Sequence, residues 1–284
     1  MKIAIISEFG HFECLGFLLE TLKEFEITVY THLNLDKYFW LDYYKSIFSF
    51  NIINNLNIDN NNNFNKIIKL TSTDLPYLQN EISILHIKNY YENNKKYLSL
   101  SPHVSGENIT YTFPIFNPIT YNTLNYSSKN ITLIGYCLNN NIDSDTKLFI
   151  QNNSDYTFNF IVWGDTHYGN LKEHKNVNIL QNINTNEMIK IINNSQFILS
   201  KKYISYDRFS GQLGLAMSFE KPIIIDSKSA STYNLPGITF NNNYSEIGKL
   251  SNISDEIYNN IVEKIKIFNK NQLSNNYNNI MKLL

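Results

Sequence analysis

The chain of 284 residues is long enough for two domains of ordinary size, and its 43% hydrophobic share can fill a core in each. The formal net charge is −1 and no dense basic stripe occurs, so the composition argues against nucleic acid as a partner. The two cysteines, Cys14 and Cys137, have no metal-ligand spacing and indicate reduced, half-buried thiols rather than a disulfide or a zinc site.

The first half opens with a strand–helix–strand pattern. An apolar, β-branched run predicts a buried strand at 2–7, a leucine stripe predicts a helix at 11–24, and 26–32 resembles a second strand. This is the βαβ unit of a parallel sheet. Beyond it we predict a helix at 36–47 and strands at 64–70, 82–87 and 97–100.

A proline cluster and the polar stretch at 120–130 predict a domain boundary, with one domain at residues 1–125 and another at residues 126–284. The alternation of strands and helices begins again after this boundary. Thr185 is the predicted N-cap of one helix in the second half. The predicted strands there are 130–136, 159–165, 176–183, 197–200, 222–226 and 237–240. The predicted helices are 143–151, 185–194, one that runs from the loop at 206–212 to about residue 220, and the last thirty residues. The alternation predicts an α/β fold of two Rossmann-like doubly wound domains facing a cleft.

No targeting or membrane signal is expected. The apolar run before Glu8 is too short for the core of a signal peptide, and no stretch is long enough to cross a bilayer. We therefore expect a cytoplasmic protein without a transmembrane segment.

Arg208 is the only arginine of the chain, and it immediately precedes a predicted helix. Lysine carries the positive charge everywhere else. A planar guanidinium grips phosphate or carboxylate oxygens in two places, which a lysine cannot do. A helix N-terminus adds unpaired N–H groups and partial positive charge, so Arg208, Ser210 and Gly211 form a candidate phosphate site.

The second half resembles the donor domain of GT-B glycosyltransferases, which use nucleotide sugars. The resemblance lies in the order of pieces, from NVNILQNINTNEMIKIINNSQFILS to SGQLGLAMSFEKPIIID, and it covers roughly residues 130–240. It implies a sugar transfer from a nucleotide-diphosphate donor to a hydroxyl of a glycan or protein acceptor, with no cofactor and no metal. The donor-binding residues it implies are Gly135, Trp163, Gly164, Asp165, Arg208, Ser210, Gly211 and Gln212.

The loop after the first strand carries the candidate catalytic residues. Ligands of open α/β sheets bind at the carboxyl ends of strands, where His11 could act as a general base that Glu8 or Glu13 orients. The alternative is structural, with His11 as a cap of the following helix and Glu13 in its first turn. Asp143 and Asp145 match a metal-binding DxD string, but they begin a predicted helix, where acids serve the dipole.

One departure from the family leaves the function open. Many retaining GT-B enzymes carry a glutamate where this chain has LGLAMS at 213–218, with no acid. An inverting enzyme, a degenerate module that binds a nucleotide, a glycan or a partner enzyme, and a nucleotide-sugar epimerase all remain compatible. A nicotinamide dehydrogenase is disfavoured, because no G-x-G-x-x-G follows either opening strand.

Overall fold

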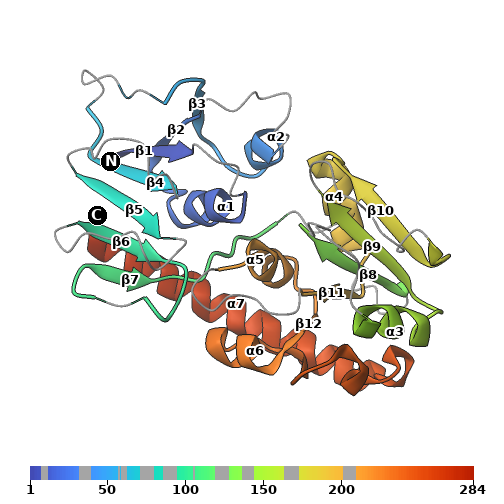
Figure 1. Cartoon of the computed structure of the whole chain (residues 1–284). Helices are drawn as coiled ribbons and strands as arrows, with labels where there is room; N and C mark the ends of the chain where they lie inside the picture. Colours follow the sequence, from blue (N-terminus) through green and yellow to red (C-terminus); the bar gives the residue numbers. More distant parts are fainter. Residues whose placement is uncertain are drawn as a thin grey trace. The chain divides into compact units, whose positions relative to one another are not determined.

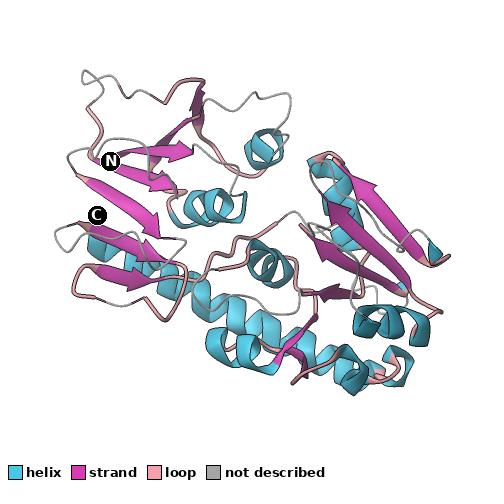
Figure 2. Cartoon of the chain, in the orientation of Figure 1, coloured by secondary structure: helices cyan, strands magenta, loops and turns pink. Residues whose placement is uncertain are grey.

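The chain divides into two compact units in a computed structural model (Figures 1 and 2). Unit 1 comprises Met1–Pro118, Ser205–Gly214 and Asn269–Leu284, and unit 2 comprises Ile119–Ile204 and Leu215–Phe268. The structure describes residues 1–7, 12–31, 40–56, 58, 63–70, 80–85, 95–104, 106–118, 128–135, 144–162, 173–200 and 209–284.

Unit 1 is built on a parallel sheet of seven strands in the order β3-β2-β1-β4-β5-β6-β7 (Figure 1). The strands are β1 (Lys2–Ser7), β2 (Glu26–Tyr30), β3 (Asn51–Ile53), β4 (Lys66–Leu70), β5 (Glu81–Leu85), β6 (Lys96–Ser99) and β7 (Ile109–Tyr111), and the helices are α1 (Phe12–Thr21) and α2 (Trp40–Lys45). The predicted βαβ opening is confirmed. The short strands β3 and β7 were not predicted.

The central strand β1 of the unit 1 sheet is buried on both faces, as its continuous apolar sequence predicts. In β1, every residue from Ile3 to Ser7 is buried. Ala4 and Ile6 pack with Tyr30 on one face, where Phe64 meets the Tyr30 ring edge-on at 5.9 Å. Alternate residues of a strand point to opposite faces, so Ile3 and Ile5 supply the other face.

A buried ion pair links neighbouring strands of this sheet. Lys69 Nζ of β4 lies 3.1 Å from Glu81 Oε2 of β5, and the two side chains are only 4% and 2% exposed. The register pairs Lys69 with Ser83, whose hydroxyl donates to Glu81 Oε1 at 2.5 Å. Two charges removed from water in this way are tolerated only while both partners are present.

The end of the long helix α7 (Asp255–Leu283) belongs to unit 1. Asn276 Nδ2 donates to the backbone oxygen of Phe113 at 2.7 Å, and Asn279 Nδ2 donates to that of Tyr111 at 2.9 Å. Lys96 Nζ donates to the backbone oxygen of Leu283 at 3.2 Å, where a cation suits the negative end of the helix dipole. The sequence leaves open whether this helix returns to the first half, and these contacts answer the question.

Unit 2 is built on a six-stranded parallel sheet in the order β10-β9-β8-β11-β12-β13, which is the doubly wound order 3-2-1-4-5-6. The strands are β8 (Asn130–Ile134), β9 (Thr157–Val162), β10 (Val177–Gln181), β11 (Phe197–Leu199), β12 (Ile223–Asp226) and β13 (Gly237–Phe240). The helices between them are α3 (Ser144–Asn152), α4 (Thr185–Asn193), α5 (Gly211–Ser218) and α6 (Ser227–Tyr233), and the first four residues of α5 belong to unit 1. Helix α6 was not predicted.

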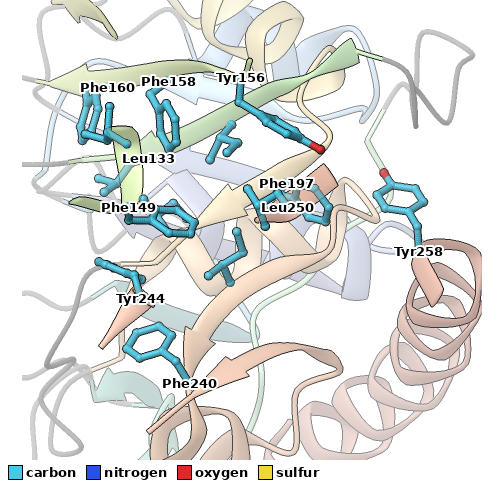
Figure 3. Packing of buried hydrophobic residues seen from close by; sticks show 14 of the residues in the cluster. Leu133, Phe149, Tyr156, Phe158, Phe160, Phe197, Phe240, Tyr244, Leu250 and Tyr258 are labelled. Carbon is cyan, nitrogen blue, oxygen red and sulfur yellow. The ribbon is translucent and has the colours of Figure 1, made fainter. Parts of the chain in front are cut away.

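Aromatic rings fill the core of unit 2, where Figure 3 shows them on strands, on α3 and on α7. Phe149 of α3 meets Phe158 of β9 edge-on at 5.9 Å, and Phe197 of β11 meets Tyr258 of α7 in the same way at 5.6 Å. Edge-to-face pairs at this spacing add to the stabilisation from burial. In this unit the many aromatic side chains therefore pack between the sheet and its helices.

The N-cap of α4 lies one residue earlier than predicted. Asn184, not Thr185, has the extended backbone of a cap, and its side chain accepts from Glu187 N at 2.9 Å. Glu187 in turn accepts from Asn184 N at 3.3 Å, which completes a capping box. Asn is at least as favourable as Thr as an N-cap residue. The position of the N-cap is therefore decided by Glu187, which lies three residues after Asn184 and completes the capping box.

Lys221 is a buried amine in unit 2. Its side chain is 4% exposed, and Nζ donates to the backbone oxygen of Asn193, at the end of α4, at 2.6 Å. Burial lowers the pKa of Lys221 from 10.5 to about 8, against the opposing effect of the Glu220 charge. The folded protein therefore holds fewer protons than the unfolded chain between these two pH values.

A pH dependence of stability follows for Lys221→Met. Because the folded pKa is the lower one, the free energy of unfolding of the wild type should rise from about pH 8 to about pH 10.5 as the amine loses its charge. Relative to the variant, the rise should be about 3 kcal/mol. Denaturant unfolding of both proteins from pH 7 to pH 11 measures the difference, and parallel curves would contradict it.

No helix in the described part of the chain combines the length and the apolar character needed to cross a bilayer.

Candidate functional site

Helix α1 brings Glu13 to the candidate site. The leucine stripe of the helix is buried, with Leu15, Leu18 and Leu19 each at most 4% exposed, and this fixes the helix on the sheet. Glu13 lies in the first turn of α1, and the residue is 6% exposed. His11 and Glu8, the other candidate catalytic residues, lie outside the described residues.

The first turn of α5 packs against other residues of unit 1. The ring of Phe209, just before the helix, meets Phe113 edge-on at 5.3 Å. Gly214 lies so close to the backbone oxygen of Pro114 that no Cβ could be placed there without a shift of backbone. The helix start is therefore held by tight backbone packing that only glycine permits.

The carboxylate of Glu13 lies over Gly211, the first residue of α5. A Cβ placed on Gly211 would be 2.6 Å from Glu13 Cδ and 2.7 and 2.8 Å from its two carboxylate oxygens. The first turn of α5 contains no acidic residue of its own. The negative charge at this helix start thus comes from α1, where the helix dipole favours it.

Two further groups of unit 1 surround this carboxylate. Cys14 Sγ donates to Glu13 Oε1 at 3.8 Å. The phenol of Tyr44, from α2, lies against Gly16 of α1, where a side chain would clash with the ring. Burial, and after it the charge of Glu13, raises the pKa of both Cys14 and Tyr44 well above the ordinary values, so both stay neutral near pH 7.

Cys14 should accordingly be unreactive in the folded protein. The thiol is fully buried and free, and its raised pKa keeps the nucleophilic thiolate scarce. In a Cys137→Ser background, a thiol-specific reagent at pH 8 should modify Cys14 only after denaturant is added. Fast labelling of the native protein, followed by mass spectrometry, would contradict this.

The other predicted residues of the α5 entrance are Ser210 and Gln212. Ser210 is half-buried, and its backbone oxygen accepts from Leu213 N at 3.0 Å. Gln212 is 4% exposed, yet neither its Oε1 nor its Nε2 has a hydrogen-bond partner among the residues described. Arg208 lies outside those residues. The structure thus brings Glu13, Ser210, Gly211 and Gln212 together in unit 1.

In unit 2, Gly135 follows β8 with a φ of 71°, a left-handed conformation that favours glycine. Its N–H donates to the backbone oxygen of Ile161 at 2.9 Å. The predicted donor residues Trp163, Gly164 and Asp165 lie outside the described residues.

The DxD string is partly explained by structure. Asp145, in the first turn of α3, accepts from Tyr244 N at 2.8 Å and from Ser245 N at 3.3 Å. Its carboxylate thus caps the short 3-10 helix at Tyr244–Ile247, while Asp143 lies outside the described residues. No group of three or more metal-ligating side chains occurs within the described ranges.

The contact between Glu13 and Gly211 could not be found from the sequence, because the two residues lie in distant segments. The available signals were weak. Gly211 opens a helix whose first turn has no acid, and Glu13 is an acid on a helix that is otherwise apolar around it.

No protein-family model matches the chain, and no curated protein matches its sequence. AviGT4, a glycosyltransferase involved in avilamycin A biosynthesis, is 8% identical with a TM-score of 0.62, and the match covers 100% of this chain and 97% of that chain.

Two other solved structures are similar over the same extent. Anabaena HepE, in complex with UDP and glucose, is 12% identical with a TM-score of 0.51, covering 98% of this chain and 93% of that one. A Listeria monocytogenes protein assigned as a UDP-N-acetylglucosamine 2-epimerase is 9% identical with a TM-score of 0.52, covering 98% and 91%. At such identities the likeness establishes the fold alone. The chain has the GT-B fold, with two Rossmann-like domains that are each built on a parallel sheet.

Proposed function

We propose that this protein binds a nucleotide sugar and transfers the sugar to a hydroxyl of a glycan or protein acceptor, with no metal ion in the donor site. The observation that supports this most is the GT-B fold, shared with a glycosyltransferase and with a protein crystallised with UDP and glucose. Fold alone does not imply an activity, so the proposal also depends on the residues at the α5 entrance.

The donor diphosphate is assigned to the start of α5. Backbone N–H groups there, with the hydroxyl of Ser210, can donate to phosphate oxygens, and Gly211 permits close approach. Arg208 would add a doubly donating cation that stabilises the departing diphosphate. We assign the nucleoside side of the donor to Gly135 and to the segment of Trp163, Gly164 and Asp165.

The transfer itself needs one base. In the proposed step, the acceptor oxygen attacks the anomeric carbon while the bond from that carbon to the diphosphate oxygen breaks. His11 takes the acceptor proton, with Glu8 orienting the imidazole, and the nucleoside diphosphate leaves with the bonding electrons. Glu13 was the alternative partner of His11, and its contact with Gly211 supports a place for it at the donor site instead.

An epimerase is the second candidate. The stretch Leu213–Ser218 has no acid where many retaining transferases have one, and the Listeria protein of the same fold is assigned as an epimerase. The two candidates share a nucleotide-sugar site and differ in whether an acceptor is consumed. A module that binds a nucleotide or glycan without catalysis would neither transfer the sugar to an acceptor nor epimerise it.

The experiment that tests the proposal is a thermal-shift screen against nucleoside diphosphates and nucleotide sugars. A ligand that binds only the folded state raises the melting temperature by mass action. Any nucleotide sugar that raises the melting temperature is then incubated with the protein, with and without acceptor glycans. NMR spectra then show whether the sugar has been transferred or epimerised. Transfer to an acceptor supports a transferase, and a new epimer without acceptor supports the epimerase. A flat screen would reject both enzymes.

A further inference from the structure

We propose that the end of α7 closes the open edge of the sheet in unit 1 and prevents a second copy of the chain from adding a strand there. The inference concerns an interaction surface and is independent of the proposed function. Strand β7 is the last strand of this sheet in the described part of the chain (Figure 1). The edge of a sheet presents backbone N–H and C=O groups that can pair with a strand of another chain.

The backbone groups of β7 that face outward follow from its bonds to β6. Thr112 N donates to a backbone oxygen of β6 at 2.8 Å, so the backbone of this residue faces the neighbouring strand. Alternate residues of a strand direct their backbone groups to opposite sides, so those of Ile109, Tyr111 and Phe113 face the open edge. Ile109 N donates to the backbone oxygen of Gly106 at 3.1 Å, within the turn before the strand.

Helix α7 occupies the next two outward positions. The backbone oxygen of Tyr111 accepts from Asn279 Nδ2 at 2.9 Å, and that of Phe113 accepts from Asn276 Nδ2 at 2.7 Å. These asparagines stand three residues apart, and residues at this spacing are neighbours on the surface of a helix. All four residues belong to unit 1. One face of α7 therefore satisfies the carbonyl groups with which an added strand would pair.

Asn276 is a polar residue in a fully buried position. It is 0% exposed, and its Oδ1 has no hydrogen-bond partner within the described ranges. A buried acceptor without a partner costs free energy, so an apolar side chain would pack at this position at a lower cost. The bond from Nδ2 to Phe113 is the one contact here that an asparagine makes and an apolar residue cannot make.

The docking of this part of α7 depends largely on polar contacts. In the segment Asn269–Leu284, which belongs to unit 1, the buried apolar residues are Ile280 and Leu283. Lys96 Nζ and Lys66 Nζ both donate to the backbone oxygen of Leu283, at 3.2 Å and 3.5 Å. Because few apolar side chains hold the segment, replacing the donating amides should release it and open the edge of β7.

Analytical ultracentrifugation of the full chain over a range of concentrations tests this. In the inward variant, Asn276→Asp with Asn279→Asp, carboxylates that only accept hydrogen bonds replace the two donating amides. We expect a sedimenting mass at least about twice that of the wild type, because a second copy can then pair with β7. The outward variant, Asn275→Asp with Asn278→Asp, is the matched control. It adds the same charge at two exposed positions of the same helix and should sediment as the wild type does.

Hydrogen exchange measures whether α7 has left the edge. In the inward variant, the amides of residues 276–283 should exchange roughly tenfold faster than in the wild type, because the two bonds to the strand are lost. Adding Tyr111→Pro to the inward variant removes an outward N–H group and leaves the bond from Thr112 to β6 in place. This third substitution should restore the mass of the wild type, because proline blocks pairing at an edge strand.

The inference requires faster exchange and association together in the inward variant, and either one without the other overturns it. Equal association of the outward variant, or association that persists with Tyr111→Pro, would also overturn it, because charge or another surface would then be responsible. Circular dichroism confirms folding. If the inward variant does not fold, Asn279→Asp alone takes its place, because Asn279 is half-buried, and it should produce both changes to a smaller extent.

Discussion

Replacing Glu81 with alanine should destabilise the protein by about 3–5 kcal/mol, because the change removes the buried carboxylate that forms an ion pair with the amine of Lys69. The pair lies inside the sheet of unit 1, where both side chains are almost fully buried and Ser83 also donates to the carboxylate. Urea unfolding followed by circular dichroism measures the loss. An effect below about 1 kcal/mol would mean that water or another group compensates Lys69.

A matched surface pair serves as the control. Lys2 and Glu26 link β1 and β2 of the same sheet at 3.3 Å, but their side chains are 58% and 56% exposed. Glu26→Ala should therefore change the stability little, because water screens such a pair. The double variant Lys69→Met with Glu81→Leu should recover most of the loss, since a buried ion pair replaced by apolar groups is often neutral or stabilising.

Arg208→Lys should lower kcat/KM for sugar transfer about 10²- to 10³-fold if the proposed function holds, with little change in melting temperature. Lysine keeps the charge but loses the planar fork that holds two phosphate oxygens at once. Arg208→Ala should lose at least as much. Steady-state kinetics with the donor found in the screen, together with thermal melts, measure both effects.

The control for Arg208 is Lys202→Ala, which removes a cation from the same stretch of sequence and leaves the arginine in place. Its turnover should stay near that of the wild type. Full turnover in Arg208→Lys would remove Arg208 from the mechanism, and an equal loss in Lys202→Ala would indicate a general effect of charge rather than a bidentate grip.

Much of the secondary structure could be predicted because it depends on local pattern. The strand at Lys2–Ser7 and the helix Thr185–Asn193 follow from apolar runs and periodicity within a few residues. The missed elements are short. Strands Asn51–Ile53 and Ile109–Tyr111 have three residues each, too few to show a period, and they exist because the sheet extends to them.

The sequence by itself determined the two-domain α/β character, the GT-B-like order of the second half and a helix entrance near Gly211, because each of these depends on consecutive residues. Only the tertiary structure decided which side chains meet. The pairing of Glu13 with Gly211 and the contact of Asn276 with Phe113 join segments that lie far apart in the sequence. Such contacts depend on how whole elements pack, and local propensity carries no information about them.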